Sequence, residues 1–415
     1  MRLDYGKTFT LGLGFMVISI TWSVYNAFVP VFYENFVKSG ILLGLLMVTD
    51  NIIGISLQPW VSHRSDKTWN RFGRRMPYIL FAAPIGAVLF ALIPFHTGLL
   101  MLLFTALGMN LAMGFYRAPA VALMPDITPR PLRSQANGII NFMGGLGALL
   151  AFFVAGPLYR VDKHIPFIAT AVVVLVAVAI LRWRIKEPAT LEGEKETREA
   201  PFLKAVGSVF KPDRRSALWL LLAIFAWFVG YNGIEAFFTL YGVHVLGVDP
   251  AAGAFTLGFL SLAFLVFAIP AGFLSARLGR KNTIRTGLVL LLVVLAGALF
   301  TRSIWVVRAL FLLAGIAWAM VNVNSYPMVV EMASDAETGT YTGLYYFFSN
   351  SAAIVGPPLT GLLRDLFGWQ YLFLYALVPM LIALLLMGLV RGGEAPKAAT
   401  EGKAGVAGTM TAPGR

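Results

Sequence analysis

Long apolar runs separated by short polar loops dominate this sequence. A helix needs roughly 20 mostly apolar residues to cross the hydrocarbon of a bilayer. Twelve runs meet this requirement, over residues 9–32, 40–62, 77–95, 98–124, 135–158, 165–185, 216–243, 253–276, 285–301, 304–330, 338–363 and 370–391. The pattern therefore predicts an all-α membrane protein with twelve transmembrane helices.

One long polar interruption divides the spans into two groups of six. Residues 186–215 combine closely spaced charges with prolines, which excludes them from the hydrocarbon and predicts a cytoplasmic linker. We therefore expect one six-helix bundle over residues 1–185 and a second over residues 216–391. Residues 392–415 are rich in Gly, Ala, Thr and Lys without apolar periodicity, which predicts a disordered cytoplasmic tail.

The two groups of spans repeat each other at a shift of roughly 205 to 208 residues. The first and seventh spans show the repeat most fully, since Trp22, Tyr25 and Asn26 are matched by Trp227, Tyr231 and Asn232. Two parallel six-helix halves with a solute site between them are the architecture of the major facilitator fold. The repeat therefore predicts two pseudo-symmetric six-helix bundles of this kind.

Composition supports the bilayer as solvent and argues against several functional classes. Apolar residues make up 58% of the chain and charged residues only 13%, whereas soluble domains carry about a quarter charged residues. The chain has no cysteine and only four scattered histidines, so we expect neither a metal site nor a cofactor. A Gly-rich phosphate loop of the Walker type is absent, and we expect no enzymatic activity.

The net charge of +13 reports membrane topology instead of nucleic-acid binding, because the basic residues lie in short loops between the spans. If the first span runs outward, about 26 of the 33 Lys and Arg residues lie on the inner side. Both termini are then cytoplasmic. The first span lacks a small-residue cleavage site, so we expect it to be retained in a multi-pass protein of the inner, or plasma, membrane.

The loop after the second span carries the most specific motif, QPWVSHRSDKTWNRFGRRMPY at residues 58–78. It places one acid among five Lys and Arg residues, which can clamp the inner helix ends by charge-assisted hydrogen bonds and release them when the halves rock apart. The alternative is that these charges only set orientation. The gating candidates in this loop are Asp66, Arg71, Gly73, Arg74 and Arg75.

Two further acids end the fourth and tenth spans on the same side. Asp126 can pair with Arg74 or Arg75, and Glu331 can pair with Arg277 or Arg280. We therefore expect a gating latch in each half. The alternative is that both acids are ordinary solvated end charges, because exposed pairs contribute little.

The loop motif resembles the glycoside, pentoside and hexuronide cation symporters. Gln58-Pro59 and the RFGRR run at 71–75 are most similar to the sucrose-proton symporter branch, and PAVALMPD at 119–126 is similar to the broader family. The resemblance implies the major facilitator fold, a sugar or glycoside as solute, and a co-transported cation. Sodium-using melibiose carriers have an acid where this chain has Gln58, so the resemblance favours a proton.

Three ionisable residues lie within the predicted spans: Asp50, Arg117 and Glu235. Such residues are costly in a bilayer unless they face a cavity or a partner, which makes them candidates for proton coupling. Glu235 is the preferred proton carrier, because it shares a helix face with Tyr231 and Asn232. Arg117 can neutralise an acid or donate to solute hydroxyls. The alternative for the two acids is a permanent hydrogen bond between helices.

Amides and aromatic rings complete a sugar-type site, since sugars present hydroxyl rims and apolar faces. The substrate-binding candidates are Trp22, Tyr25, Asn26, Asn110, Arg117, Tyr231, Asn232, Asn322, Asn324, Tyr346 and Asn350. Each asparagine is equally suited to bridging two helices.

The leading hypothesis is secondary active transport, in which a monomer in the lipid bilayer moves a sugar or glycoside together with protons by alternating access. One alternative is a carrier of the same fold for an amphiphile, such as a lysolipid or drug, running outward. The 32 phenylalanines keep that alternative open. A membrane sensor or scaffold is a third hypothesis, for which we would expect a large folded appendage.

Overall fold

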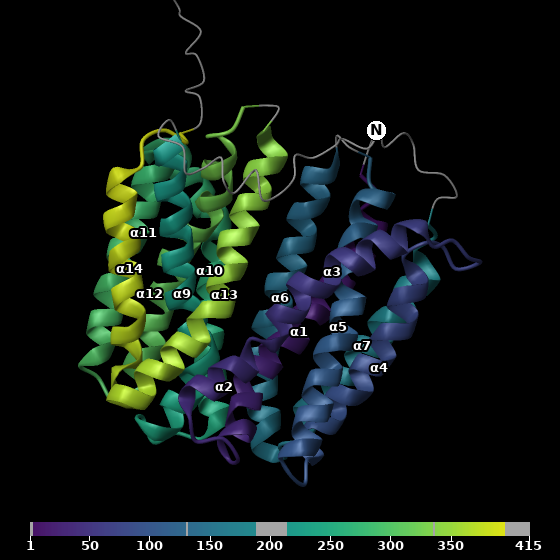
Figure 1. Cartoon of the computed structure of the whole chain (residues 1–415), viewed down its shortest axis with the longest axis horizontal. Helices are drawn as coiled ribbons and strands as arrows, with labels where there is room; N and C mark the ends of the chain where they lie inside the picture. The colour runs from purple at the N-terminus through teal and green to yellow at the C-terminus, as the bar shows by residue number, and fades with distance from the viewer. Residues whose placement is uncertain (1–2, 130–131, 188–213, 335–336, 395–415) are drawn as a thin grey trace, which may run out of the picture.

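The computed structural model describes residues 3–129, 132–187, 214–334 and 337–394. Its regular elements are helices (Figure 1). The N-terminal half contains α1 (Tyr5–Glu34), α2 (Gly40–Met47), α3 (Thr49–Lys67), α4 (Met76–Leu92), α5 (Leu99–Ile127), α6 (Arg133–Val161) and α7 (Ile165–Arg184). The C-terminal half contains α9 (Arg215–His244), α10 (Pro250–Leu278), α11 (Arg280–Leu299), α12 (Ile304–Val330), α13 (Thr338–Phe367) and α14 (Leu372–Leu389). Short 3-10 helices at Ile93–Phe95 and Trp369–Tyr371 follow α4 and precede α14.

The predicted fold class is confirmed, and each predicted span corresponds to a helix or a pair of helices. Among the described residues, 11 helical segments are long and apolar enough to cross a membrane. The remaining predicted span is α13, which carries Tyr346, Ser349 and Asn350 in its middle. A helix that lines a polar cavity does not need an apolar face all around, which explains its lower hydropathy.

The second span is broken at Val48, whose φ of −96° and ψ of 3° end α2 and begin α3. The two pieces have different partners, because α2 packs against α13 of the other half while α3 packs against α5. The packing of α2 is close, since a Cβ on Gly44 would lie 2.5 Å from the backbone of Pro358. The break places Asp50 in the first turn of α3, where a helix N-terminus favours negative charge.

Apolar side chains cover the circumference of the bundle. Along α4, the exposed residues Phe81, Ile85, Val88 and Leu92 recur every three or four positions and so form one stripe on the helix. The interior of each half is filled by large aromatic residues, including Tyr25 and Phe28 in one half and Trp227 and Phe238 in the other. This arrangement is expected for a protein that is solvated by lipid tails.

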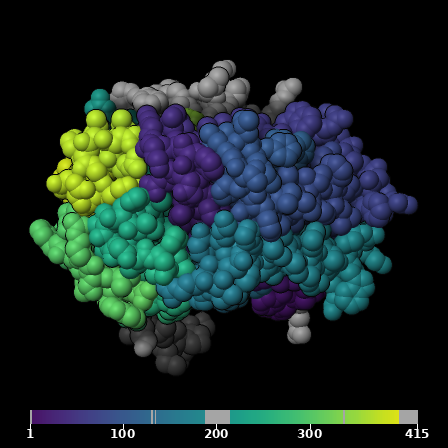
Figure 2. Space-filling view, turned by 90° about the horizontal axis from the view of Figure 1, so that it is seen from below, coloured from purple at the N-terminus to yellow at the C-terminus, as the bar shows by residue number. Residues whose placement is uncertain are grey.

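The two halves lie side by side and separate toward one end (Figure 1). We call the end that carries the N-terminus the inner end and the opposite end the outer end. At the outer end, the halves meet through α2 with α13 and through α6 with α10. Figure 2 shows this outer end, where segments of both halves meet over the whole face. The halves are therefore closed against each other on one side of the membrane.

The boundaries predicted for the linker and the tail remain predictions. Residues 188–213 of the linker and 395–415 of the tail lie outside the described residues.

Candidate functional site

The fold brings the three ionisable candidates toward the middle of the molecule from both halves. Asp50 begins α3, Arg117 lies in α5 and Glu235 lies in α9. The charge of Asp50 acts on both Arg117 and Glu235, so all three belong to one electrostatic cluster.

Glu235 also reaches across to the N-terminal half by a polar contact. Its carboxylate lies near the Asn26 amide on α1, which packs against α9. The repeat partner of Asn26 behaves differently, because the Asn232 amide donates to the Phe228 carbonyl of its own helix at 2.7 Å. Asn26 thus has a position at the interface of the two halves, whereas Asn232 bonds within α9.

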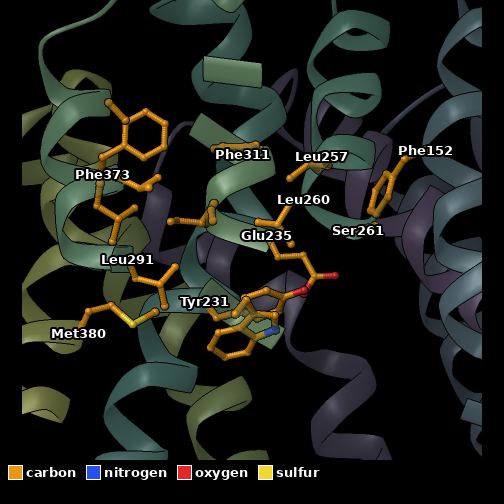
Figure 3. Close-up of a pocket in the computed structure, with 16 residues that line it drawn as sticks. Phe152, Tyr231, Glu235, Leu257, Leu260, Ser261, Leu291, Phe311, Phe373 and Met380 are labelled. Atoms are coloured by element: carbon orange, nitrogen blue, oxygen red, sulfur yellow. The ribbon is translucent and has the colours of Figure 1, made fainter. Parts of the chain in front are cut away.

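A pocket of about 50 Å³ lies beside Glu235, lined mostly by residues of the C-terminal half and also by Phe152 of α6. Figure 3 shows Glu235 and Tyr231 next to each other at this pocket. The rest of its wall is mostly apolar and includes Leu257, Leu260, Leu291, Phe311 and Phe373. The Tyr231 ring stacks on Trp318 with the ring centroids 4.3 Å apart and an interplanar angle of 5°. This site combines one carboxyl group with a flat aromatic surface.

Two of the N-terminal candidates lie in the interior and not on a cavity. Tyr25 is 0% exposed, and the Asn110 amide donates to its hydroxyl at 3.5 Å. Asn110 also donates to the Thr49 hydroxyl at 2.9 Å, which links α5 to the first turn of α3 beside Asp50. Trp22 is half-buried and meets Tyr25 edge to face with centroids 5.8 Å apart. Tyr25 and Asn110 are therefore placed to fix the position of the broken second span.

Arg117, Tyr346 and Asn350 are exposed although each lies well inside its helix. Tyr346 is 55% exposed, and the charge of Arg117 acts on it from the other half. A charged side chain at this depth has to face water or a partner. Arg117 meets both conditions, since it is exposed and acts on Tyr346 of the opposite half. On α12, Asn322 is half-buried, and Asn324 is 3% exposed and donates to the Met320 carbonyl at 2.8 Å within its own helix.

A cluster of three tyrosines on α12 and α13 was not predicted as a group. The ring centroids of Tyr326 and Tyr345, and of Tyr345 and Tyr346, are 5.3 Å apart in each pair. Tyr326 and Tyr346 are exposed, and Tyr345 bonds to Ser325 at 3.3 Å between the hydroxyl oxygens. Neighbouring tyrosines on the tenth and eleventh spans are the signal that could have indicated the cluster.

At the inner end of the N-terminal half, Arg75 is 5% exposed and holds the loop motif together. Its guanidinium donates to Asp126 at 3.0 Å and to the Ser62 carbonyl at 3.2 Å, and it also contacts Asp66. Arg74 binds the same Asp126 carboxylate at 2.7 Å. Both arginines, named as alternatives from the sequence, thus converge on one acid within one half.

The other basic gating candidates are arranged more loosely. Arg71 is exposed, with its guanidinium carbon 4.6 Å from the centroid of the Phe72 ring. In the C-terminal half, Arg280 binds Glu331 at 3.3 Å, and Arg277 is exposed. Of the two arginines considered as partners of Glu331, the structure places Arg280 in the pair.

Glu187 and Glu394, which the sequence analysis assigned to the linker and to the tail, each cap the start of a helix. The Glu187 carboxylate accepts the backbone N–H groups of Arg74, Arg75 and Met76 at 2.7 to 2.9 Å, at the start of α4. The Glu394 carboxylate accepts those of Arg280 and Lys281 at 2.6 and 2.9 Å, at the start of α11. These acids are related by the same shift as the two halves, which is the signal that could have indicated them.

Glycine is required beside each capping acid. Gly73 has a φ of +111°, and a Cβ there would lie 2.7 Å from the Glu187 carboxyl carbon. Gly279 has a φ of +86°, and its Cβ would lie 3.0 Å from a Glu394 oxygen. L-residues rarely adopt such φ values, so glycine at both positions lets the acid reach the helix N-terminus. The gating role of Gly73 stays a prediction.

The outer end is closed by ion pairs that join the two halves. The Glu34 carboxylate at the end of α1 accepts a hydrogen bond from the His244 imidazole at 2.8 Å and pairs with Arg364 at 3.3 Å. Arg364 also donates to the Lys38 carbonyl at 2.7 Å, and Asp365 accepts the Gly40 backbone N–H at 2.7 Å. The sequence analysis did not identify this set, since nothing in the pattern pairs the first span with the seventh and eleventh.

A stacked arrangement supports these pairs. The imidazole of His244 lies parallel to the Trp369 ring with centroids 5.5 Å apart, and the guanidinium carbon of Arg364 lies 4.5 Å from a Trp369 ring centroid. A second pair between the halves joins Arg160 to Asp249 at 2.9 Å. In the part of the chain that the structure describes, the ion pairs between the halves lie at the outer end, while those at the inner end stay within one half. The structure is therefore open toward the inner end.

The described ranges contain no group of three or more His, Asp or Glu side chains suited to holding a metal ion.

Comparisons with known proteins agree with the fold. A family model described as Major Facilitator Superfamily matches residues 11–269 and 251–413. The tetracycline resistance protein, class H, of Pasteurella multocida is 23% identical over 362 residues, which cover 84% of either protein.

Among solved structures, a bacterial homologue of the human lysosomal transporter Spinster in an inward-facing and unoccupied conformation has a TM-score of 0.77 at 16% identity, over 94% of this chain and 98% of that one. A point mutant of the nucleoside transporter NupG has a TM-score of 0.74 at 13% identity, over 92% of this chain and 99% of that one. These similarities at low identity concern the fold.

Proposed function

We propose that this chain, which belongs to the major facilitator superfamily, is a proton-coupled symporter of a sugar or glycoside that works by alternating access. The observation that carries this proposal is the central cluster, in which Glu235 of one half faces Asn26 and the charge of Asp50 on the other half. Because the cluster spans the interface of the halves, its protonation state bears on how the halves move.

The chemistry of Glu235 links the proton to the solute. As a carboxylate it only accepts hydrogen bonds, and like-charge repulsion with Asp50 opposes its approach to the N-terminal half. Protonation removes that repulsion and turns the group into a donor for Asn26 or a solute hydroxyl. The protonated, solute-bound site can then close, whereas a site with solute but no proton keeps the unfavourable charge pair.

Recognition of a sugar-type solute is supported by the groups around the cluster. Arg117, Tyr346 and Asn350 are exposed and offer donors and acceptors for a hydroxyl rim. The stacked rings of Tyr231 and Trp318 next to Glu235 offer a flat surface for the apolar face of a sugar ring.

The latches at the two ends support alternating access. The outer pairs around Glu34 join the halves and have to break when the outer side opens, whereas the inner networks around Arg75 and Arg280 stay within their halves. When the inner side closes, the exposed Arg71 and Arg277 come toward the opposite half and can form the missing pairs there.

The proposal is tested by proton movement in proteoliposomes on addition of a panel of monosaccharides, disaccharides and glycosides. Solute-dependent alkalinisation of the outside is expected for the native protein and is expected to be lost in Glu235→Gln. Asp162→Asn, which changes an exposed acid in the loop between α6 and α7, serves as the matched control. If no sugar or glycoside moves protons in either direction of the gradient, the proposal fails.

A second candidate function is the transport of an amphiphile by the same fold, which the mostly apolar pocket beside Glu235 favours. The similarity to a tetracycline resistance protein points the same way. The pocket of about 50 Å³ has to widen to hold more than a short apolar group. Proton movement caused by a lysolipid or by tetracycline, and not by sugars, in the same vesicles would select this function.

A further inference from the structure

A separate cavity lies at the outer end, where the two halves meet. Its volume is about 170 Å³, and it is lined by Gly156 and Arg160 of α6, by Ala252 and Phe255 of α10, and by Arg308 of α12. A cavity volume of roughly 10–15 Å³ is enough for a single bound water, so this cavity has room for a polyatomic ion. It is remote in the fold from the cluster around Glu235, which none of these five residues joins.

Arg308 gives this cavity an uncompensated positive charge. Its Nε donates to the Thr256 hydroxyl at 3.2 Å, and Thr256 carries no charge. Its guanidinium carbon lies 4.6 Å from the Trp305 ring centroid and 5.4 Å from that of Phe255. Among the described residues, no acid forms an ion pair with Arg308. In this part of the chain only the Nε–H of Arg308 has a hydrogen-bond partner, so its other guanidinium N–H groups can bind an anion from outside the chain.

Arg160 adds a second guanidinium to the same cavity from the other half. It is paired with Asp249 at 2.9 Å, and its charge still acts on Arg308. Two arginines therefore line the cavity, and the Asp249 carboxylate beside it offsets one of their two charges, which leaves one positive charge. Planar guanidinium groups match phosphate oxygens with paired donors, better than they match most other anions.

The position of the cavity fits the level of lipid headgroups. Arg308 lies in the second turn of α12, and Trp305 in the first turn is 72% exposed. Tryptophan is enriched at the boundary between hydrocarbon and water. An anion at this level can come from the membrane or from the solution outside it.

We propose that this cavity binds a singly charged phosphate group, held by Arg308 of the C-terminal half and Arg160 of the N-terminal half. The phosphate belongs either to an anionic phospholipid of the adjacent leaflet or to a free phosphate ion. Because α6 and α10 have to stay in contact for the cavity to exist, the bound group stabilises the closed outer end. A Cβ on Gly156 would lie 2.9 Å from the Ala251 carbonyl oxygen, which shows how close this contact is.

Thermal unfolding in detergent tests the site with three probes: phosphatidylglycerol, phosphatidylcholine and inorganic phosphate. A ligand that binds the folded state raises the midpoint, and the rise grows with the logarithm of the ligand concentration divided by its Kd. We expect phosphatidylglycerol to stabilise the native protein more than phosphatidylcholine, and Arg308→Gln to weaken that affinity about tenfold. Arg302→Gln, which removes an exposed arginine just before α12, is the matched control and should leave the affinity unchanged.

The outcomes separate the sources and decide the proposal. An effect of inorganic phosphate that depends on Arg308 assigns the site to the free ion, and an effect of the lipid alone assigns it to the headgroup. An equal loss in Arg302→Gln, or no loss in Arg308→Gln, would overturn the proposal by showing general surface attraction. If Arg308→Gln does not fold, Arg308→Lys and Arg160→Gln replace it, and unchanged affinity in both would overturn the proposal as well.

The predicted effect on conformation has its own readout. Because the chain has no cysteine, a single cysteine at Asn350 reports on access from the inner end without background. We expect whichever probe binds, phosphatidylglycerol or inorganic phosphate, to increase the labelling rate of Asn350→Cys about threefold or more. The same probe should have no such effect when Arg308→Gln is also present. A decreased rate would contradict stabilisation of the closed outer end.

Discussion

Glu34 at the end of α1 and Arg364 near the end of α13 form an ion pair of 3.3 Å between the two halves. Both side chains are largely buried, and each makes further contacts, Glu34 with His244 and Arg364 with the Lys38 carbonyl. The pair therefore belongs to a network that is broken only when the outer end opens. The conformational balance of the protein should depend on it.

Removal of the acid in this network should favour the outer-open state. Glu34→Gln weakens charged hydrogen bonds worth about 1.5–3 kcal/mol, which corresponds to a tenfold or larger shift in the balance. The labelling rate of Asn350→Cys from the inner side should therefore fall. Asp162→Asn, an exposed acid on the same surface, should leave the rate unchanged. An equal labelling rate in Glu34→Gln and the native protein would show that the network does not hold the outer end closed.

The basic residues of the inner loop should differ strongly in their effect on stability. Arg75→Gln removes the nearest partner of Asp66 and one of the two arginines that bind Asp126, and the loss of hydrogen bonds to charged groups costs about 1.5–3 kcal/mol. Arg71→Gln changes an exposed residue and should cost less than about 0.5 kcal/mol. Denaturant unfolding in detergent measures both. Similar losses for the two variants would contradict the central position of Arg75.

The two capping acids should contribute to stability in proportion to the backbone groups that they accept. Glu187→Ala removes an acceptor for three N–H groups at the start of α4, and we expect a loss of about 1–2 kcal/mol. Glu394→Ala removes an acceptor for two N–H groups at the start of α11 and should cost less. Thermal unfolding of both variants checks this order. No measurable loss in either would contradict the capping role.

The Glu337 carboxyl predicts a pH dependence at the start of α13. Hydrogen bonds from Arg214 and Ser334 hold the pKa of Glu337 below its usual value of 4.5. A lowered folded pKa stabilises the protein above pH 4.5, and this contribution is lost as the pH falls through the folded pKa. The difference in melting temperature between the native protein and Glu337→Gln should therefore shrink on acidification from pH 7 to 3. Exposed pairs contribute about 0.2–1 kcal/mol, so the difference at pH 7 should be small. A constant difference across this range would be inconsistent with a titrating Glu337.

Much of the fold could be predicted from the sequence, because length and hydropathy decide which segments cross a bilayer. The repeat of Asn26 and Asn232 indicated two related halves. Because charged residues are rare within the spans, Asp50, Arg117 and Glu235 could be identified as candidates. Their assembly into one electrostatic cluster needed the structure, since hydropathy does not give the rotation of a helix about its axis.

Contacts between distant segments could not be predicted in the same way. The pairing of Glu34 with Arg364 depends on how the halves lean together, and the break at Val48 depends on the different packing partners of α2 and α3. Nothing local in the sequence encodes either feature. Glu187 was overlooked for another reason: it lies in a polar segment, which looks like a linker until the helix N-terminus that it caps is seen.

The most direct test of the central claim compares uphill transport with exchange in proteoliposomes that contain Glu235→Gln. The account predicts that this variant no longer accumulates the sugar or glycoside against its gradient when a proton gradient is imposed. Exchange of labelled for unlabelled solute should persist, since it needs the solute site and the rocking motion but no net proton movement. Accumulation at the native level in Glu235→Gln would contradict the assignment of Glu235 as the proton carrier.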